Sequence, residues 1–370
     1  MNIIIEGWKK PKQIVEMVEC KGMGHPDTVC DDLCESCSRA LSKFYRLRFG
    51  KVLHHNIDKA VLIAGKSSPK FNGGEIIEPM KVILVGRATS KTGNIVIPIK
   101  EICHKAAEKH LKDKLGLKKF RLDIEVKEGA SNLKQVMKKA VANDTSIGVA
   151  HYPLTELEKV VKKASEYLGS DEFLVNHKYV GKDIKIMGLR VSNRITLTVA
   201  IAFIGKHVKS MADYKKAKKD VRLLLEKKTK AEVNINTLDS YEDEGSIYLT
   251  VTGLSAEMGD DGNAGRGNRY DRLITPNQSM SMESYAGKNV NHPGKLYQVL
   301  SYRIAKKLVE DLKIGNAEVK LLTKIGKPLD EPEIVSITVE EECSEDKVRE
   351  IVEGIFKDIP SIQRELVLGG

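Results

Sequence analysis

Apolar side chains recur along the chain with two periodicities, one typical of helices and the other typical of strands. Between residues 211 and 228 the apolar positions follow one another at steps of three and four, which predicts an amphipathic helix. Residues 194–204 alternate small or polar side chains with large apolar ones, as expected of a strand that packs on one face. The two periodicities together predict a protein that contains both helices and strands.

Applied along the whole chain, the same patterns predict a regular succession of elements. Helices are expected at 27–48, 100–115, 154–168, 211–228, 293–313 and 345–357. Strands are expected at 2–6, 12–20, 52–64, 80–88, 120–127, 184–191, 194–204, 231–236, 317–323 and 334–340. The order helix, strand, strand, helix recurs three times, and a strand follows the second helix in the first two rounds. No self-similarity of residues accompanies this recurrence.

The composition is typical of a soluble globular protein, because 30% of the 370 residues are charged and 5% are aromatic. This length predicts two or three domain-sized units. No apolar run approaches the length of a membrane span, and the first six residues lack the basic start and long apolar core of a signal peptide. The sequence therefore predicts a cytoplasmic protein that does not insert into a membrane.

The formal net charge of +10 raises the question of a nucleic-acid partner, but 61 basic residues are interleaved with 51 acidic ones. The densest basic run, 215–219, lies in a predicted helix with Asp213, Asp220 and Glu226 nearby, as in a solvated helix face. An RNA-binding surface would need aromatic side chains for base stacking, and Tyr214 alone is poor support. We therefore predict no nucleic-acid partner, while the positive charge suits an anionic substrate such as a nucleotide.

Three cysteines in the first predicted helix, Cys30, Cys34 and Cys37, have the C-x3-C-x2-C spacing of radical enzymes that hold an iron–sulfur cluster. Offsets of four and three also place the three side chains on one helical stripe, together with apolar residues such as Leu41. A cluster needs thiolates that converge from a loop, and this segment has no loop signal. We interpret the cysteines as reduced core residues, which suits the cytoplasm, and keep the iron–sulfur enzyme as an alternative.

A glycine-rich loop with both signs of charge follows a short β-branched run. In residues 253–269 the glycines allow positive φ and a close approach of the backbone to a ligand. The charged residues of the loop are Asp260, Asp261, Arg266 and Arg269. This mixture suits a metal-bound polyphosphate, because amides and guanidinium groups bind phosphate oxygens while carboxylates bind the cation. An exposed turn between two strands is the plain alternative.

A second charged segment, Gly24-His-Pro-Asp27, begins a stretch without further Gly or Pro that extends to about Phe49. Pro26 suits the first turn of a helix, so Asp27 is expected at the helix N-terminus and His25 at its cap. Helix N-termini favour negative charge and offer unpaired amides, so phosphate can bind there beside a metal-holding carboxylate. His25 can donate a hydrogen bond to an oxygen that gains negative charge, although such turns are more often simple caps.

These two segments and several others resemble the S-adenosylmethionine synthetases (methionine adenosyltransferases), and the flanking sequence is similar to the archaeal branch. The resemblance covers nearly the whole chain. Its motifs are Glu19-Cys-Lys-Gly-Met-Gly-His-Pro-Asp27, His54-His-Asn-Ile-Asp-Lys59, Gly65-Lys-Ser-Ser-Pro-Lys-Phe-Asn-Gly-Gly74, Ala142-Asn-Asp-Thr-Ser146 and the segment from Gly259 to Lys295. Several long motifs in the same order make the resemblance specific.

The resemblance implies an α+β fold of three similar two-layer α/β units of the β-α-β-β-α-β type, arranged about a pseudo-threefold with interleaved segments. The units would span 1–135, with the His-Pro-Asp helix start, 136–245, and 246–370, with the phosphate loop. The implied reaction makes S-adenosylmethionine from ATP and L-methionine by attack of sulfur on ribose C5′, followed by hydrolysis of the released tripolyphosphate. Mg²⁺, a monovalent cation (K⁺) and a homodimer with active sites at the subunit interface are implied as well.

The implied catalytic residues combine a histidine, four cations and two metal-binding carboxylates. By resemblance, His25 contacts the leaving oxygen, while Asp27 and Asp260 hold Mg²⁺. The cations expected along the phosphates are Lys185, Arg266, Lys288 and Lys295. Lys185 lies in Asp183-Ile-Lys185 at the start of a strand, where a lysine is otherwise common as edge protection.

The phosphate loop departs from the family at one position. The family's Gly-Asp-x-Gly-x-x-Gly-Arg falls on residues 259–266, and the bacterial and eukaryotic members follow this arginine with a catalytic lysine. This chain has Gly267 there. Arg269, Lys288 or Lys295 could supply the missing positive charge, and the departure favours the archaeal branch.

The implied substrate-binding residues are mostly polar and come from several segments. They are Glu19, Asp58, Lys59, Ala142, Asn143, Asp144, Thr145, Ser146, Asp261 and Arg269. By resemblance, Asp144 binds the amino group of methionine, and Glu19 has a similar acidic role. From the residues alone, the segment 142–146 is better explained as an Asx-turn that caps the next element.

Alternation along the predicted strand assigns His54-His-Asn-Ile-Asp-Lys59 to two faces. One face would hold His54, Asn56 and Asp58, and the other His55, Ile57 and Lys59. The adjacent histidines would then point in opposite directions, and they lack a third ligand at a usual metal spacing. Asp58 and Lys59 are the better candidates for the site.

Residues 60–67 satisfy a relaxed phosphate-loop pattern, Ala-x4-Gly-Lys-Ser. That motif needs a glycine-rich loop between a strand and a helix, whereas here the variable positions are apolar and Pro69 follows. We therefore predict a strand that ends in a loop, and reject a P-loop ATPase. By resemblance, residues 65–74 form a mobile loop at the mouth of the active site.

Overall fold

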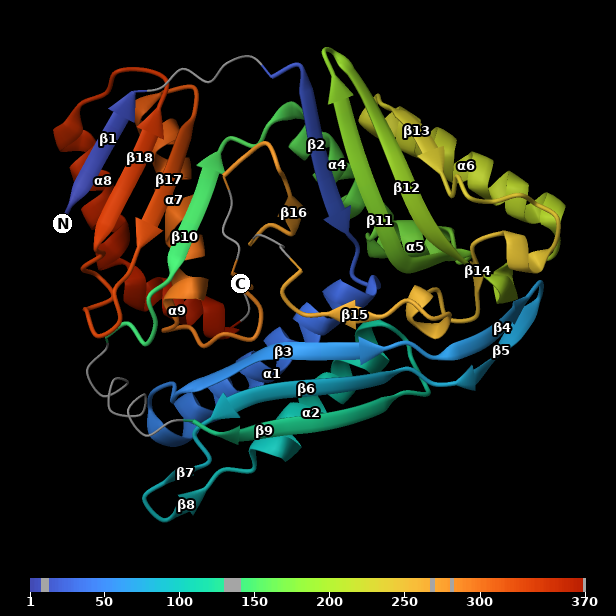
Figure 1. Ribbon diagram of the computed structural model, residues 1–370, viewed down its shortest axis with the longest axis horizontal. Coiled ribbons are helices and arrows are strands. Elements are labelled where there is room, and N and C mark those ends of the chain that lie inside the picture. Colours follow the sequence, from blue (N-terminus) through green and yellow to red (C-terminus); the bar gives the residue numbers. More distant parts are fainter. Residues whose placement is uncertain (8–12, 130–140, 267–269, 280–282, 369–370) are drawn as a thin grey trace.

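The computed structural model describes residues 1–7, 13–129, 141–266, 270–279 and 283–368. In this part of the chain the long strands form three sheets, and each sheet has helices packed on one face (Figure 1). Three hydrophobic clusters fill the space between the sheets and their helices. The mixture of helices and strands predicted from the two periodicities is confirmed.

The sheet that carries α1 has the strand order β15-β3-β6-β9. Its strands are β15 (Gly262–Asn263), β3 (His55–Ile63), β6 (Lys81–Ala88) and β9 (Arg121–Glu128). The helices that cover one face are α1 (Pro26–Phe49) and α2 (Ile99–Lys109), the latter continued by a π-helical turn (His110–Lys114). β3 and β6 are antiparallel, while β6 and β9 are parallel.

A second sheet has the order β13-β12-β11-β2-β16, with β14 beside β12. Its strands are β13 (Glu232–Ile235), β12 (Arg194–Ile204), β11 (Val180–Val191), β2 (Val15–Lys21), β16 (Leu273–Ile274) and β14 (Leu249–Thr250). Its helices are α4 (Glu156–Leu168), α5 (Asp171–Asn176) and α6 (Met211–Thr229). The predicted stripe of α6 is confirmed, since Tyr214, Ala217, Val221 and Leu225 are buried.

The third sheet joins the two ends of the chain in the order β1-β18-β17-β10. Its strands are β1 (Ile3–Gly7), β18 (Ile334–Val339), β17 (Ala317–Leu322) and β10 (Ile147–Tyr152). The helices around it are α7 (Pro293–Leu312), α8 (Glu345–Lys357) and α9 (Ile359–Leu368). β1 is parallel to β18, so the first strand of the chain completes a sheet formed mainly by the last third.

Residues 65–74 are mostly paired, which corrects the predicted loop. β4 (Lys66–Lys70) and β5 (Gly73–Glu78) form an antiparallel ribbon. Its tip is held by the Phe71 amide, which donates to Glu244 Oε1 at 2.8 Å. The polar, glycine-rich composition predicted a loop. The two strands were missed because the two halves of this short segment pair with each other. The rejection of a P-loop is confirmed, since a strand rather than a helix follows β3.

The remaining short elements lie in the connections between the longer strands and helices. They are the ribbon of β7 (Lys91–Thr92) and β8 (Ile95–Val96) and the 3₁₀ turns Gly205–His207, Glu244–Ser246 and Ser255–Glu257. No helix within the described ranges is long and apolar enough to cross a membrane.

Candidate active site

The N-terminus of α1 has the local geometry predicted from Gly24-His-Pro-Asp27. His25 is the N-cap in an extended conformation, and its Nδ1 accepts a hydrogen bond from the Asp27 amide at 3.2 Å. Pro26 lies in the first turn, where an amide hydrogen would have no helical partner. Asp27 therefore lies at the positive end of the helix dipole.

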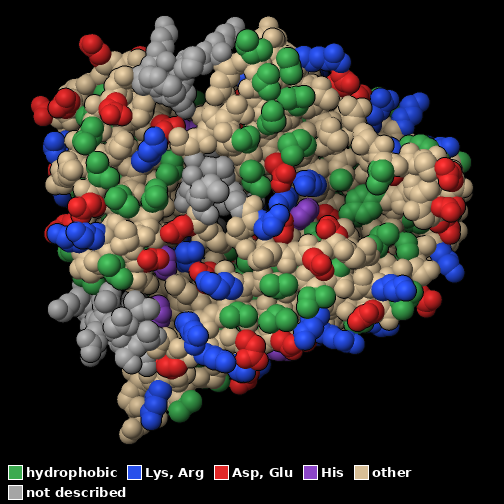
Figure 2. All heavy atoms as spheres, in the orientation of Figure 1, with side chains coloured by type: hydrophobic (Ala, Val, Ile, Leu, Met, Phe, Trp, Pro, Cys, Tyr) green, Lys and Arg blue, Asp and Glu red, His purple; other side chains and the backbone are tan. Residues whose placement is uncertain are grey.

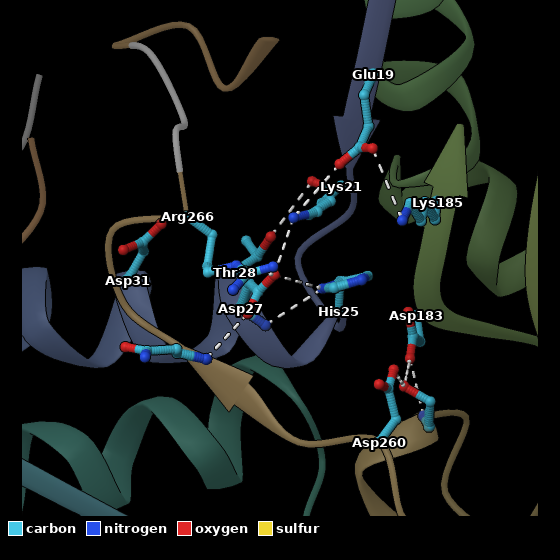
Figure 3. Close-up of polar contacts among 12 residues, drawn as sticks. Glu19, Lys21, His25, Asp27, Thr28, Asp31, Asp183, Lys185, Asp260 and Arg266 are labelled. Carbon is cyan, nitrogen blue, oxygen red and sulfur yellow. Dashed lines mark hydrogen bonds and ion pairs between the residues drawn. The ribbon is translucent and has the colours of Figure 1, made fainter. Parts of the chain in front are cut away.

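Asp27 binds three other parts of the chain (Figure 3). Its Oδ2 accepts a hydrogen bond from Lys21 Nζ at 2.8 Å and lies 3.7 Å from Arg266 Nε. Its Oδ1 accepts a hydrogen bond from the Asn263 amide at 2.9 Å. Burial would raise the pKa of Asp27, but the hydrogen bonds from Lys21 and Asn263 and the Lys21 charge outweigh it and lower the pKa. Asp27 is therefore an ionised carboxylate that links β2, α1 and the glycine loop.

β2 and β11 bring two lysines and a glutamate to the same point. Lys21 and Lys185 lie opposite each other in the antiparallel register, and Glu19 lies on the same face two residues before Lys21. The Glu19 carboxylate is 3.3 Å from Lys21 Nζ and 3.7 Å from Lys185 Nζ. The structure thus brings Glu19 and Lys185 together with Asp27. It also adds Lys21, which the sequence reasoning missed although it alternates with Glu19 on one strand.

His25 is held as a neutral hydrogen-bond donor. Burial is the main cause that lowers its pKa, followed by the Lys21 charge, while Asp27 and Asp260 oppose this shift. Because Nδ1 accepts from the Asp27 amide, the neutral ring carries its hydrogen on Nε2. His25 can therefore donate from Nε2 to an oxygen in front of the helix N-terminus.

Asp260 lies apart from Asp27, on the other side of His25 (Figure 3). Its Oδ2 is 2.8 Å from Ser255 Oγ, which also donates to Asp183 Oδ2. Burial raises the pKa of Asp183 to about 6 even though Ser255 hydrogen bonds oppose the shift. The two predicted metal-binding carboxylates thus have separate partners, and sequence reasoning did not single out Asp183 or Ser255 as neighbours of Asp260.

Glycines of the loop allow its close approach to α1. At Gly262 a Cβ would come within 2.5 Å of the Pro26 carbonyl carbon, so this position requires glycine. Gly265 has a φ of +80°, and its amide donates to Asp31 Oδ1 at 2.8 Å. These contacts hold the following Arg266 beside Asp27 with 61% of its side chain exposed.

Two other predicted loop residues have different outcomes. The Asp261 carboxylate accepts a hydrogen bond from the Ala64 amide at 2.8 Å, which ties the loop to the chain just after β3. Arg269 lies outside the described residues.

A second group of predicted residues surrounds Asp58 on β3. Lys59 Nζ donates to Asp58 Oδ1 at 2.7 Å, and Lys288 Nζ lies 3.5 Å from Asp58 Oδ2. Lys288 Nζ also donates to the Ser284 carbonyl at 2.8 Å. Burial would raise the pKa of Asp58, but the Lys59 hydrogen bond and the Lys288 charge lower it. Asp58 is therefore ionised between two cations.

A bulge in β3 corrects the predicted faces of this strand. The pairing with β6 shifts register between Asn56 and Lys59, which inserts an extra residue into the alternation. His55 and Ile57 are both buried, in agreement with the prediction that they share a face. Lys59 is exposed and does not share that face. Sequence alternation gave the wrong face for Lys59 because a bulge leaves no signal in the pattern of side chains.

Lys295 is 1% exposed and binds α1 rather than the helix start. Its Nζ donates to both carboxylate oxygens of Glu35, at 2.9 Å and 2.7 Å, and lies 4.7 Å from the centre of the Tyr285 ring. Burial would raise the pKa of Glu35, but the charge and hydrogen bonds of Lys295 outweigh it and lower the pKa. Glu35 also accepts the Gly287 amide at 3.0 Å, so this pair anchors the segment that carries Lys288.

The polar segment before β10 lies near the second group. Its buried members are Ala142, Asn143 and Ser146. The Asp144 Oδ1 accepts from the Thr145 amide at 2.8 Å, and its Oδ2 lies 3.5 Å from His292 Nε2. Thr145 Oγ1 accepts from the Ile325 amide at 3.1 Å. Most of this segment therefore makes structural contacts within the chain, while the Asp144 carboxylate remains half exposed.

Many of the predicted site residues, together with Lys21, form two groups within one chain. The helix-start group contains Glu19, Lys21, His25, Asp27, Lys185 and Arg266. The Asp58 group contains Asp58, Lys59, Lys288, Lys295 and Asp144. Glu35, which binds Lys295, lies about 12 Å farther along the axis of α1 than Asp27, so the two groups lie at different points along this helix.

A cavity of about 590 Å³ lies beside α1 and extends from Thr28 to Arg39. Two ion pairs lie in its lining: Arg272 binds Asp32 at 2.5 Å, and Arg39 binds Glu35 at 3.1 Å. Among its described lining residues, none is a predicted site residue. The cavity therefore gives no reason to move the candidate site away from the helix start.

The cysteine stripe of α1 lies in the hydrophobic core, as predicted. Cys30, Cys34 and Cys37 are fully buried, and Cys37 Sγ donates to the Cys103 carbonyl at 3.4 Å. Burial raises the pKa of Cys30 and Cys34, which keeps both as thiols. In the described residues, no group of three or more His, Cys, Asp or Glu side chains is arranged to hold a metal ion.

Comparison with known proteins identifies the family of this chain. The sequence model of the S-adenosylmethionine synthetase (AdoMet synthetase) family matches residues 2–370. The chain belongs to this family. Membership in the S-adenosylmethionine synthetases therefore extends over nearly the whole chain, as the sequence motifs predicted.

Similar synthases occur in archaea and in a bacterium. The chain is 42% identical to the S-adenosylmethionine synthase of Haloquadratum walsbyi, with 99% of this chain and 97% of the relative covered. It is 41% identical to the S-adenosylmethionine synthase of Methanothermobacter thermautotrophicus, with 100% and 98% covered. The probable S-adenosylmethionine synthase of Aquifex aeolicus is 43% identical, with 89% and 86% covered.

Proposed function

We propose that the helix-start group binds the polyphosphate of ATP and stabilises the leaving group during S-adenosylmethionine synthesis. The methionine sulfur forms a bond to ribose C5′, and the C5′–O bond breaks with its electron pair moving to the tripolyphosphate oxygen. The sulfur becomes a sulfonium cation, while the tripolyphosphate gains one negative charge. Water then hydrolyses the tripolyphosphate to pyrophosphate and phosphate.

The observation that carries this proposal is the convergence of three cations and a neutral histidine at the start of α1. A thioether is uncharged and needs no general base, so the barrier depends on stabilising the leaving oxygen. Lys185 and Arg266 supply positive charge, and His25 presents Nε2–H beside them. The N-terminus of α1 adds its own positive potential.

Mg²⁺ suits the carboxylates of this site. Asp27 is ionised, and Asp260 lies beyond His25 in the same region. Mg²⁺ is usually bound by one or two protein carboxylates together with substrate phosphates and water, and it would neutralise phosphate charge here. We propose Asp27 and Asp260 as its protein ligands, with K⁺ as an additional monovalent cation.

Asp27→Asn tests this metal assignment. The amide cannot supply the negative charge that attracts Mg²⁺, so turnover should fall and the remaining activity should need more Mg²⁺. Activity is measured against Mg²⁺ concentration, with circular dichroism as the check on folding. An unchanged rate with an unchanged Mg²⁺ dependence would remove Asp27 from the metal site.

We further propose that a homodimer completes each site from two chains. The helix-start group of one chain would meet the Asp58 group of its partner, which supplies Lys288 and Asp144 for phosphate and methionine. Figure 2 shows hydrophobic side chains over the uncovered faces of β2 and β11 and of β3 and β6, with charged side chains between them. The exposed apolar residues there are Met17, Leu189 and Val191, and Val61, Ile63 and Val85. Such faces are typical of subunit interfaces.

The organisation of the chain supports two related proposals. Each of the three sheets has its helices on one face and its own hydrophobic cluster, which supports three similar units about a pseudo-threefold. The units would centre on residues 1–135, 136–245 and 246–370, with β1, β2, β10, β14, β15 and β16 each pairing in the sheet of another unit. Buried free cysteines suit a reducing compartment, so we propose the cytoplasm as the location.

The function is tested by incubating the pure protein with ATP, L-methionine and Mg²⁺. Mass spectrometry should detect S-adenosylmethionine, and phosphorus NMR should detect pyrophosphate and phosphate in equal amounts. The matched control omits methionine, which should abolish S-adenosylmethionine formation. Release of ADP without S-adenosylmethionine would contradict the proposed function.

A further inference from the structure

Lys21 is a buried lysine in the helix-start group to which no role has been assigned. Only 7% of the residue is exposed, and its Nζ is 2.8 Å from Asp27 Oδ2 and 3.3 Å from Glu19 Oε1. Figure 3 shows its ammonium group between Glu19 and Asp27, on the side of β2 that faces the start of α1. The side chain therefore joins the strand to the two carboxylates of the site.

The strand register brings two lysines to the same point of the sheet. Lys21 lies directly opposite Lys185 on β11, and like charges directly opposite each other destabilise a sheet. Glu19 compensates only partly, because it lies diagonally between the two lysines and is shared by both. A single lysine would suffice to pair with Asp27. Lys21 and Lys185 together thus place two positive charges beside the start of α1.

The charges around Asp27 favour a bound polyanion. Lys21 and Arg266 both approach Asp27 Oδ2, at 2.8 Å and 3.7 Å, and Lys185 lies on the far side of Glu19. Three cations thus approach the carboxylates of Glu19 and Asp27 from different elements. Lys21 is the most buried of the three cations, and a charge in a poorly solvated site interacts more strongly with a neighbouring anion.

Other candidate cations lie elsewhere. Lys288 binds Asp58, and Lys295 is enclosed by Glu35 and Tyr285. We propose that Lys21 is a catalytic residue whose ammonium contacts the tripolyphosphate and stabilises the negative charge that its oxygen gains as the C5′–O bond breaks. This inference rests on the proposed function and adds a residue to it. Lys21 supplies from a strand the positive charge that the glycine loop lacks after Arg266.

The test compares Lys21→Gln with Lys21→Arg and Arg190→Met. Glutamine can still donate a hydrogen bond to Asp27, so the fold should persist while the charge is lost. We expect Lys21→Gln to lose roughly 10²-fold in kcat at saturating Mg²⁺, as when one preorganised donor is removed, with a much smaller change in ATP affinity. Lys21→Arg restores the charge and should recover at least part of the loss.

Arg190→Met is the matched control for structural pairing. Arg190 lies opposite Glu16 on the same two strands and binds its carboxylate at 3.0 Å, away from the helix-start group. Its removal should lower the melting temperature and leave kcat per folded molecule unchanged.

Two results would overturn the role of Lys21. One is a Lys21→Gln variant that turns over within threefold of the wild type. The other is a loss that saturating Mg²⁺ restores, which would make Lys21 only a support for Asp27. Wild-type protein that forms no S-adenosylmethionine would instead overturn the proposed function itself.

Discussion

Arg266 combines exposure with a fixed backbone, which suits a side chain that must meet a phosphate. The preceding Gly265 is held by Asp31, and the guanidinium group lies beside Asp27 with most of its surface exposed. A planar guanidinium can bind two phosphate oxygens at once, whereas an ammonium group cannot. The backbone contacts therefore position Arg266, and its chemistry determines what it binds.

Arg266→Lys should retain the positive charge and lose this bidentate geometry. We expect a loss of roughly 10²-fold or more in kcat, because an interaction made mainly in the transition state is removed. The affinity for ATP should weaken much less. Steady-state kinetics and equilibrium titration with ATP separate the two quantities. Turnover within a few-fold of the wild type would show that Arg266 mainly holds the loop.

His55 links the stability of the protein to pH. The ring is fully buried, with Nε2 2.9 Å from Ser38 Oγ and Nδ1 3.0 Å from the Leu53 carbonyl. Burial, the main cause, lowers its pKa to about 3, so between pH 3 and 6.5 the unfolded chain binds a proton that the folded chain does not. The stability from neutral His55 is therefore present above the unfolded pKa and is lost as the pH falls towards 3.

The expected loss from His55 between pH 7 and pH 5 is about 2 kcal/mol of unfolding free energy. His55→Gln cannot take up a proton, so its stability should fall less over the same interval. Urea unfolding of both proteins at several pH values measures the difference. Parallel curves for wild type and variant would contradict the assignment.

At the scale of elements, α1 packs into the hydrophobic core with one face and contributes its first turn to the candidate site. The cysteine stripe packs on the sheet below, while Asp27 and Asp31 on the same helix hold the glycine loop. Substitutions on the buried face of α1 should therefore lower the stability of the protein and leave turnover per folded molecule largely unchanged.

Replacing Cys30, Cys34 and Cys37 together with serine tests this division. Each substitution puts a hydroxyl group into an apolar cluster, and burial of a polar group costs about 1–3 kcal/mol in proteins. The melting temperature should fall clearly, while turnover per folded molecule stays near the wild-type value. Differential scanning calorimetry and activity assays measure the two effects. Bound iron in the wild type that disappears in the variant would revive the iron–sulfur alternative.

Long periodic elements could be predicted from the sequence, whereas irregular ones could not. The helix predicted at 27–48 and the strands predicted at 184–191 and 194–204 match α1, β11 and β12 closely. β10 was missed because its small residues, such as Gly148 and Ala150, give little hydrophobic contrast. The site was partly predictable for the same reason: the cap at His25 is a local feature, but the meeting of Lys21 with Asp27 and Arg266 depends on tertiary structure.

At the scale of the whole molecule, the separation of the two groups of site residues is the main feature to explain. Lys185 belongs to the helix-start group and Lys288 to the Asp58 group, which is bound to α1 well beyond its first turn. If each active site takes one group from each subunit, two inactive variants with different groups impaired can complement each other. The sites can then be assigned to one chain or two without a structure of the dimer.

We expect Lys185→Met and Lys288→Met to be nearly inactive alone, since each removes a phosphate-binding cation from every site. When the two are co-expressed, half of the dimers should be mixed, and one of the two sites in a mixed dimer carries neither substitution. Activity should therefore recover to about a quarter of the wild-type value. The matched control combines Lys185→Met with Arg266→Ala; because both impair the helix-start group, no intact site can form. Light scattering confirms the dimer, and a mixture of Lys185→Met and Lys288→Met that stays inactive would place each site within a single chain.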